Sequence, residues 1–185
     1  MRMPLLLGLL LLPVTELVQA GPPAFSLSHP MSAYTPTALR RQYELAAAGK
    51  EAGEAFYNSL QAYHGQEPLV LGYKAASEAI KARDASMLNK LTYVQQAART
   101  FEQAVNLAPQ SAEIRFLRFS VESNLPPFLG LSKHVDEDKG FLLNAALQHP
   151  NSGLDDEAFR TVRGFLVGRG HVSGEAAEQL ARVKG

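Results

Sequence analysis

Apolar residues recur every three or four positions along most of the chain, which is the period of a helix with one buried face. The clearest stretch runs from Leu91 to Gln110, where the apolar residues that share one helical face are Val94, Ala97, Ala98, Phe101, Ala104, Val105 and Ala108. Pro109 follows the last turn, and proline cannot continue a helix. No segment shows the alternation of apolar and polar residues that marks a strand. We therefore predict an all-α fold.

The same period, together with capping and stop signals, predicts eight helices. Thr35, Ser86, Ser111, Asp155 and Ser173 are the expected N-caps. The expected spans are 36–48, 50–64, 68–84, 86–109, 111–125, 136–150, 155–168 and 173–183, with a loop and a short helical turn at 128–135. Short helices joined by tight turns favour consecutive antiparallel hairpins, which hide their apolar faces by stacking.

The composition is that of one globular domain. The chain has 185 residues, of which 46% are hydrophobic and 19% charged, so it can bury a core and is too apolar for global disorder. Its net charge is zero, which gives no reason to expect binding to nucleic acid or to an anionic membrane surface. Because the chain has no cysteine, disulfides, thiolate metal sites and cysteine nucleophiles are excluded.

Residues 1–20 have the pattern of a secretory signal peptide: Arg2 comes first, an apolar run follows at 5–12, and Ala20 completes a cleavage site of small residues. The run is shorter than the roughly 20 apolar residues of a transmembrane helix. We expect cleavage after Ala20, export to the periplasm or the extracellular space, and no stable membrane span afterwards. An uncleaved N-terminal anchor is the alternative. Residues 21–35, rich in proline and serine, are expected to form a flexible linker to a helical repeat-like domain at 36–185.

Ala97, Phe101 and Pro109 match the second-helix signature of the tetratricopeptide repeat, in which alanine and phenylalanine four positions apart precede a proline. Ala104 is small where that family prefers a small residue. In physical terms, the small residues let a neighbouring helix approach, Phe101 fills the space between hairpins, and Pro109 ends the helix. The chain thus resembles this family over about twenty residues.

A weaker copy of the signature follows in Leu142, Ala145 and Pro150, at an offset of 41 residues instead of the family's 34. Asp138 stands at the place of Ala97, and the first-helix half of the pattern is absent: the family's spacing places Lys81, Asp84, Ala85 and Leu88 there. The resemblance implies a short right-handed superhelix of helical hairpins that binds proteins or peptides. It implies no particular ligand-binding residue. The alternative is an unrelated helical bundle in which the same residues are ordinary core.

One cluster, Lys133 to Asp138, contains possible metal ligands. His134, Asp136 and Asp138 offer imidazole and carboxylate groups that suit zinc, manganese or nickel. The spacing matches neither the H-E-x-x-H motif nor a calcium-binding loop. The alternative is an acidic helix start, favoured by the helix dipole, beside a solvated histidine.

Four residues of the fifth expected helix are candidates for partner binding: Arg115, Phe116, Arg118 and Phe119. If the other apolar residues of that helix face the core, these four lie at its margin or outside. Arginine and aromatic residues exposed together are typical of protein interfaces. The alternative is a helix buried on two sides, with the two phenylalanines in the core.

The sequence contains no catalytic signature. It lacks a G-x-S-x-G motif and a phosphate-binding loop, and its carboxylates have helix-start or surface explanations. We therefore predict a non-enzymatic protein without a cofactor, which binds an unknown protein or peptide in the cell envelope or the secreted space. A metal-binding protein that uses His134, Asp136 and Asp138, and a carrier of a small ligand, are the alternatives.

Overall fold

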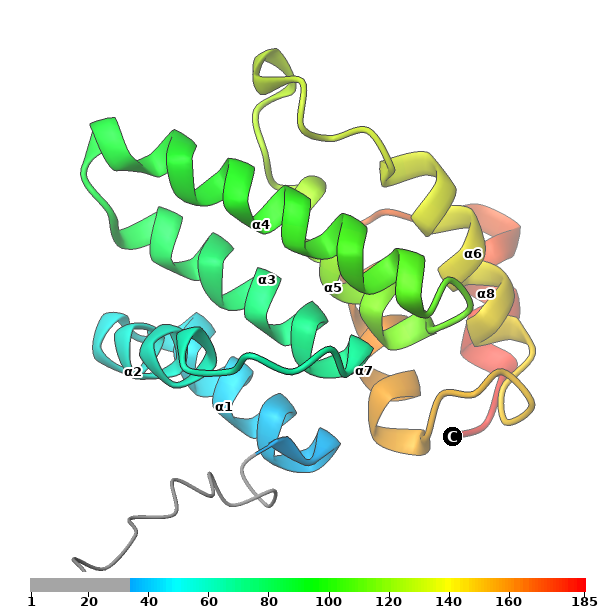
Figure 1. Ribbon diagram of the computed structural model, residues 1–185. Coiled ribbons are helices and arrows are strands. Elements are labelled where there is room, and N and C mark those ends of the chain that lie inside the picture. The colour runs from blue at the N-terminus through cyan, green and yellow to red at the C-terminus, as the bar shows by residue number, and fades with distance from the viewer. Residues whose placement is uncertain (1–33) are drawn as a thin grey trace, which may run out of the picture.

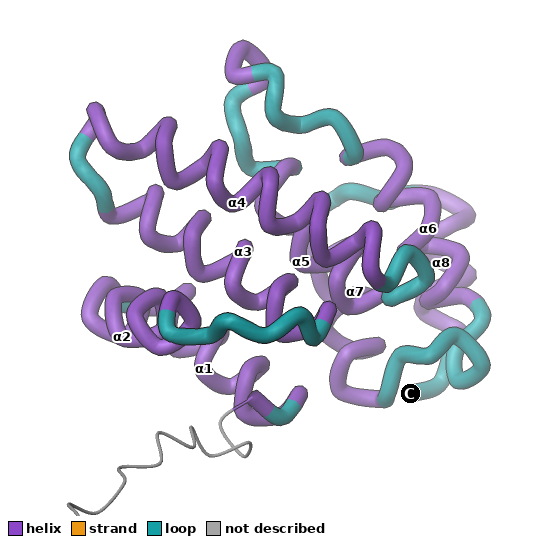
Figure 2. Tube along the Cα trace, viewed as in Figure 1, coloured by secondary structure: helices purple, strands orange, loops and turns teal. Residues whose placement is uncertain are grey.

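The structure is a computed structural model that describes residues 34–185, and over this range it contains helices and no strand (Figure 1, Figure 2). The predicted all-α fold is confirmed. The helices are α1 (Pro36–Ala48), α2 (Lys50–Gln61), α3 (Pro68–Asp84), α4 (Met87–Leu107), α5 (Ala112–Glu122), the 3-10 turn η2 (Pro127–Leu129), α6 (Val135–Leu147), α7 (Asp156–Gly168) and α8 (Gly174–Arg182). The predicted signal peptide at 1–20 lies outside the described residues, as does the predicted linker at 21–35 except for its last two residues.

Side chains at the helix starts explain why three of the boundaries fall where the sequence predicts them. The side chains of Thr35, Ser111 and Asp155 each accept a hydrogen bond from a backbone N–H in the first turn of α1, α5 and α7. Ser86 and Ser173 precede α4 and α8 without such a bond. These five positions therefore mark helix starts, although only three of them act through a side-chain cap.

Three helices end three residues earlier than the sequence predicts. α2 stops at Gln61 instead of at residue 64, because the carbonyl oxygen of Tyr63 accepts from the Lys74 side chain and the Tyr63 hydroxyl accepts from the Glu67 N–H. α5 ends at Glu122 and α6 at Leu147, each three residues before its predicted end. After α5 and α6 the chain continues in turns, in which the Asn124 N–H donates to the Val121 carbonyl and the His149 N–H to the Ala146 carbonyl.

The helices follow one packing pattern along the chain. From α1 to α7 each helix packs against the next one, α8 packs against α6, and α3 also packs against α1 on one side and α5 on the other (Figure 1). α5 in turn meets α7 through aromatic rings, because the ring of Phe165 lies edge-on to the rings of Phe116 and Phe119 at centroid distances of 5.5 and 5.7 Å. The odd-numbered helices α1, α3, α5 and α7 thus form a continuous row.

The core has a centre on either side of α5. One group of buried residues comes from α1 to α5 and contains Phe101, whose side chain is 1% exposed. The other comes from α5 to α8 and contains Phe119 and Phe159. Ala97 and Ala104 are also buried, and α4 ends two residues before Pro109, so the predicted packing of this helix is confirmed. Tyr34, at the end of the predicted linker, packs against the Tyr63 ring.

A buried carboxyl group on α3 gives the fold a measurable pH dependence. Glu78 is fully buried, and one of its oxygens accepts hydrogen bonds from Gln61 and Gln96. The other oxygen has no partner among the described residues. Burial raises the pKa of Glu78, because it penalises the charged form. The folded protein therefore holds this proton more tightly than the unfolded chain does, and its stability decreases as the pH rises from about 4.3, the ordinary pKa of glutamate, through the raised pKa.

Replacing Glu78 with glutamine is therefore expected to raise the free energy of unfolding at pH 7 by roughly 1–2 kcal/mol, since the variant buries no charge. At about pH 4, where the wild-type carboxyl is also neutral, the difference should shrink. Thermal denaturation at a series of pH values measures both effects. Glu102→Gln, on the exposed face of α4, is the matched control and should leave the free energy of unfolding unchanged at both pH values. A Glu78→Gln variant less stable than wild type at neutral pH would contradict this account.

Candidate functional site

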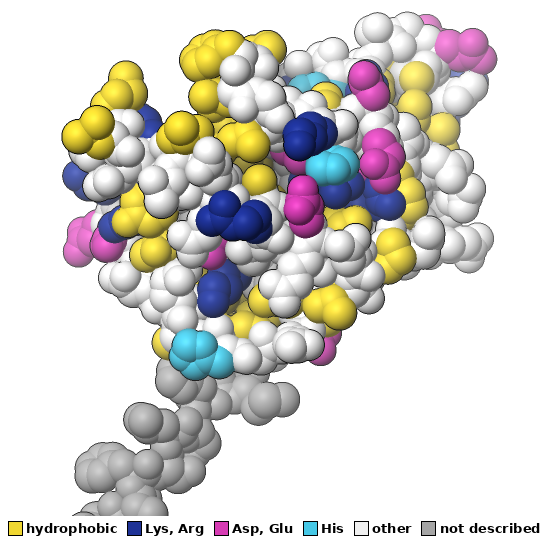
Figure 3. All heavy atoms as spheres, turned by 45° about the horizontal axis from the view of Figure 1, so that its top comes forward, with side chains coloured by type: hydrophobic (Ala, Val, Ile, Leu, Met, Phe, Trp, Pro, Cys, Tyr) yellow, Lys and Arg dark blue, Asp and Glu magenta, His cyan; other side chains and the backbone are white. Residues whose placement is uncertain are grey.

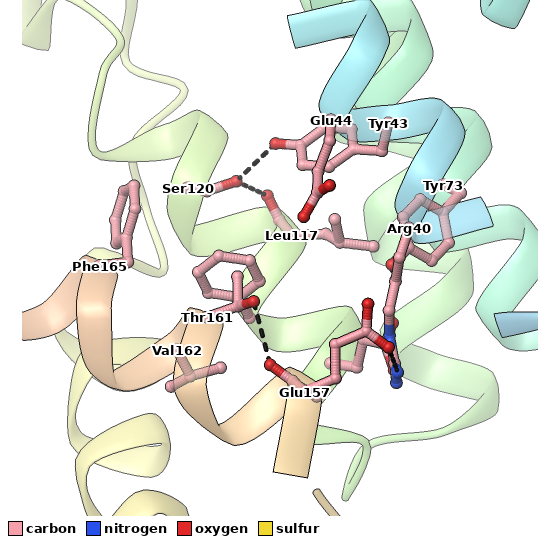
Figure 4. A pocket seen from close by; sticks show the side chains of 13 residues that line it. Arg40, Tyr43, Glu44, Tyr73, Leu117, Ser120, Glu157, Thr161, Val162 and Phe165 are labelled. Carbon is pink, nitrogen blue, oxygen red and sulfur yellow. Dashed lines mark hydrogen bonds and ion pairs between the residues drawn. The ribbon is translucent and has the colours of Figure 1, made fainter. Parts of the chain in front are cut away.

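A groove between α1, α3, α5 and α7 is lined by both charged and aromatic side chains. It encloses a cavity of about 160 Å³, and each helix of the odd-numbered row contributes side chains to it (Figure 4). The residues that line this groove are Arg40, Tyr43, Glu44, Tyr73, Glu113, Phe116, Leu117, Ser120, Glu157, Ala158, Thr161, Val162 and Phe165. We call it the odd-helix groove.

Arg40 ties one end of the odd-helix groove together. Its guanidinium group donates to both oxygens of Glu113 on α5, at 2.8 and 2.7 Å. It also donates to Asp155, the cap of α7, at 2.8 Å and to Glu157 in the first turn of α7 at 3.1 Å. A single cation on α1 thus holds carboxylates from two other helices. The Tyr73 hydroxyl adds a fourth element by donating to Glu113 at 2.7 Å from α3.

The protonation states at this end of the groove follow from these contacts. The hydrogen bonds to Glu113 raise the pKa of Arg40 and outweigh its partial burial, so the guanidinium stays charged. Burial and then the charge of Glu113 raise the pKa of Tyr73, so its hydroxyl remains a donor. Partial burial opposes ionisation of Asp155, but the Ala158 N–H and Arg40 more than compensate and lower its pKa. At neutral pH this end therefore holds one guanidinium group among carboxylates.

The rest of the odd-helix groove is apolar and aromatic. Leu117 on α5 and Val162 on α7 line the cavity, and Tyr43 closes it from α1 with its hydroxyl 3.4 Å from the Ser120 Oγ (Figure 4). Phe116 on α5 packs edge-on against the Phe165 ring of α7 at the cavity wall. Within the described residues this lining contains no histidine, cysteine or lysine. Its chemistry is therefore apolar contact, hydrogen bonding and charge pairing.

The four residues predicted to form an exposed partner site, Arg115, Phe116, Arg118 and Phe119, are buried. α5 packs against α3 on one side and against α6 on another, so it has little free surface. Phe119 belongs to the core, and Phe116 reaches the groove only at its wall. The prediction of an exposed patch is wrong, and the alternative of a helix buried on two sides is correct.

The two arginines face a carboxylate instead of solvent. The fully buried Asp138 of α6 accepts from Arg115 Nη1 at 2.8 Å and from Arg118 Nε and Nη2 at 2.7 Å each. Glu137 adds a partly exposed bond to Arg115 at 2.6 Å, and this bond, against a small opposing effect of burial, lowers the pKa of Glu137. This cluster joins α5 to α6 and has a structural role, because a buried charge is stable only when it is paired.

The structure does not bring the three predicted metal candidates together. His134 Nδ1 lies 2.8 Å from Glu122 Oε1, Asp136 pairs with Lys139, and Asp138 is enclosed by the two arginines. Among the described residues no group of three histidine or acidic side chains has the arrangement of a metal site. The interpretation of His134, Asp136 and Asp138 as one metal site is therefore wrong, because the helical turn points these side chains in different directions.

A second exposed feature lies at the outer ends of two hairpins. Met87 and Leu88 at the start of α4 and Phe128 in η2 are almost fully exposed, and Figure 3 shows hydrophobic side chains gathered at these two tips. The tips are convex (Figure 3). The odd-helix groove combines a cavity with charged groups, so it is the stronger candidate for a functional site.

Comparisons with protein-family models, with curated proteins and with solved structures find no match for this chain. The groove is therefore interpreted from its own geometry. Of the helices between residues 34 and 185, none combines the length and the apolar character needed to cross a membrane.

Proposed function

We propose that the protein is a non-catalytic interaction module whose odd-helix groove binds a segment of another protein or a peptide. The observation that carries the proposal is the lining of the groove: four helices from separate hairpins supply one continuous surface, apolar at its centre and charged at one end. Aromatic side chains and arginine at such a surface are typical of protein interfaces. From the signal-peptide pattern of residues 1–20 we also propose that this binding takes place in the periplasm or outside the cell.

The packing pattern supports a short tetratricopeptide-like superhelix, which we propose as the finer architecture. The pairs α1–α2, α3–α4 and α5–α6 pack together, and the first helix of each pair packs against the first helix of the next pair. α5 meets α7 in the same way through the rings of Phe116 and Phe165. Stacked hairpins of this kind create an extended concave surface on the side of their first helices. The odd-helix groove lies on that side.

Leu71 and Gly72 on α3 add a local argument for this architecture. The first-helix signature of the tetratricopeptide repeat contains leucine followed by glycine, and both residues are buried in this helix. A Cβ atom at Gly72 would lie 3.4 Å from side-chain atoms of Ile114 and Leu117 on α5. At that distance a Cβ atom would make ordinary van der Waals contact, so α3 and α5 pack closely here and an alanine would also fit.

The size of the cavity bears on what the groove holds. A volume of about 160 Å³ is close to that of an engineered protein cavity, of about 150 Å³, that binds benzene. Such a space accommodates one side chain of a partner and is too small to enclose a whole lipid. A protein or peptide that inserts one residue fits the groove better than a small ligand that has to be enclosed.

A photo-crosslinking amino acid placed in the groove tests the proposal. Thr161 is exposed on α7 at the edge of the cavity, and Gln103 is exposed on α4, outside the groove. With extract of the source cells, the probe at position 161 is expected to crosslink a defined protein or peptide that the probe at position 103 does not. The captured molecule, once purified, should bind the wild-type protein and fail to bind a Thr161→Trp variant. Equal crosslinking at both positions, or unchanged binding to the variant, would contradict the proposal.

A further inference from the structure

Resting on the proposed function, we infer that the odd-helix groove selects a basic amphipathic segment. In this arrangement an apolar side chain of the ligand enters the cavity, and a neighbouring lysine or arginine pairs with the carboxylates at its edge. The inference depends on three features of the groove: its charge balance, the availability of its carboxylates, and the apolar lining of its cavity.

The charge balance of the lining favours a cationic ligand. Arg40 supplies one positive charge against the carboxylates of Glu44, Glu113 and Glu157, so negative charge exceeds positive charge by two at neutral pH. Asp155, bonded to Arg40 at the rim, adds a further negative charge. A surface of one sign raises the local concentration of ligands of the opposite sign and repels those of its own sign.

The carboxylates differ in how free they are to bind a ligand. Glu113 is committed, because both of its oxygens accept from Arg40 and one also accepts from Tyr73. Asp155 and Glu157 are about half-exposed, and each shares Arg40 with other acceptors. Glu44 is exposed on α1 and has no hydrogen bond or ion pair within residues 34–185. The carboxylates that remain available to a ligand therefore lie on α1 and α7, two of the four helices that line the cavity.

An acidic ligand has no comparable partner in this groove. Arg40, the one basic residue of the lining, is 12% exposed in its side chain and is already bonded to three carboxylates. Binding of a carboxylate or phosphate would have to displace one of these bonds. A lysine or arginine of the ligand can join Glu44 and Glu157 without breaking any of them.

The cavity next to these carboxylates selects the second half of the ligand. Leu117, Val162 and Phe165 supply apolar surface, and the volume suits one side chain such as leucine or phenylalanine. Burial of such a side chain contributes most of the affinity, whereas the exposed ion pairs contribute orientation and selectivity. A ligand with an apolar and a basic side chain on one face can contact the cavity and the carboxylates at the same time.

Two labelled peptides of opposite charge test this inference. One is a 12-residue amphipathic peptide of leucine and lysine, and the other has glutamate at every lysine position; fluorescence anisotropy with the purified protein gives each Kd. We expect the leucine–lysine peptide to bind and to weaken as salt increases, and the glutamate peptide to bind at least tenfold more weakly. The double variant Glu44→Gln/Glu157→Gln is expected to raise the Kd of the basic peptide roughly fivefold, whereas Glu102→Gln on α4 should leave it unchanged.

The Thr161→Trp variant, checked for an unchanged melting temperature, shows whether a peptide occupies the groove, and it separates the two levels of the proposal. If the glutamate peptide binds as tightly as the lysine peptide and Thr161→Trp abolishes both, the groove is a binding site but the inferred basic ligand is wrong. If neither peptide binds, or if Thr161→Trp leaves the Kd of the peptides unchanged, both the inference and the proposed function are contradicted. Self-association that Thr161→Trp removes, without peptide binding, would identify a second copy of the chain as the occupant and would overturn the inference.

Discussion

Replacing Asp138 with alanine is expected to lower the free energy of unfolding by about 3–5 kcal/mol. Asp138 is 0% exposed and is the carboxylate that Arg115 and Arg118 share between α5 and α6. Without it, two buried guanidinium groups lose their principal partner, and burying an unpaired charge costs far more than the pair contributes. Urea denaturation followed by circular dichroism measures the loss.

Asp136 provides the matched control for this prediction. It is an aspartate in the same first turn of α6, but its side chain is 94% exposed and pairs with Lys139 at the surface. Exposed ion pairs contribute about 0–1 kcal/mol, so Asp136→Ala should change stability by less than about 1 kcal/mol. Equal losses for the two variants would show that the acidic helix start, and not the buried arginine cluster, carries the effect.

Replacing Phe101 with alanine is expected to lower the free energy of unfolding by about 3–5 kcal/mol. Phe101 is 1% exposed and belongs to a core group that also contains residues from α1, α2, α3 and α5. Removing the ring loses the transfer free energy of the apolar atoms and leaves a cavity that stiff helices fill only in part. Thermal and urea denaturation both measure the change.

Phe128 is the control for Phe101. Its side chain is 85% exposed in the turn η2, so Phe128→Ala removes the same atoms from the surface instead of the core. We expect a change of less than about 0.5 kcal/mol for Phe128→Ala. A Phe101→Ala variant that is as stable as Phe128→Ala would contradict the packing of α4 described above.

The helices could be predicted from the sequence because their signals are local. The 3.6-residue period, the caps at Thr35, Ser111 and Asp155, and the prolines all act within a few residues. The end of α2 was not predictable in this way. The contacts of Tyr63 with Glu67 and Lys74 that replace its last turn involve the path of the following loop.

The groove could not be predicted, because its residues are distant in the sequence. Arg40 meets Glu113 across 73 positions and Asp155 across 115, and no local pattern relates them. Glu113 lies at a helix start, where a carboxylate is expected in any case. Its pairing with Arg40 therefore cannot be recognised from the sequence. Arg115 looked exposed for a related reason: arginine is almost never fully buried unless it is paired, and its partner Asp138 lies on the next helix.

The first-helix half of the tetratricopeptide pattern does not occur in this chain at the family's spacing from Ala97. Counting back from Ala97 with the family's fixed spacing reaches Lys81, which assumes helices of the family's usual length. α3 has 17 residues and α4 has 21, so the turn between them lies farther from Ala97 than the family spacing allows. A count at the family's spacing therefore does not reach Leu71 and Gly72, the leucine–glycine pair near the start of α3.

The most direct test of the proposed groove is a two-dimensional NMR titration of the ¹⁵N-labelled protein with the leucine–lysine peptide. The account predicts that the largest shift changes occur at amides of α1, α5 and α7 around the cavity, including Tyr43, Leu117, Thr161 and Phe165. Amides on the outer face of α4, such as those of Glu102 and Gln103, should stay in place. Shift changes confined to α4 or to the exposed tips at Leu88 and Phe128, or no change at all, would contradict the account.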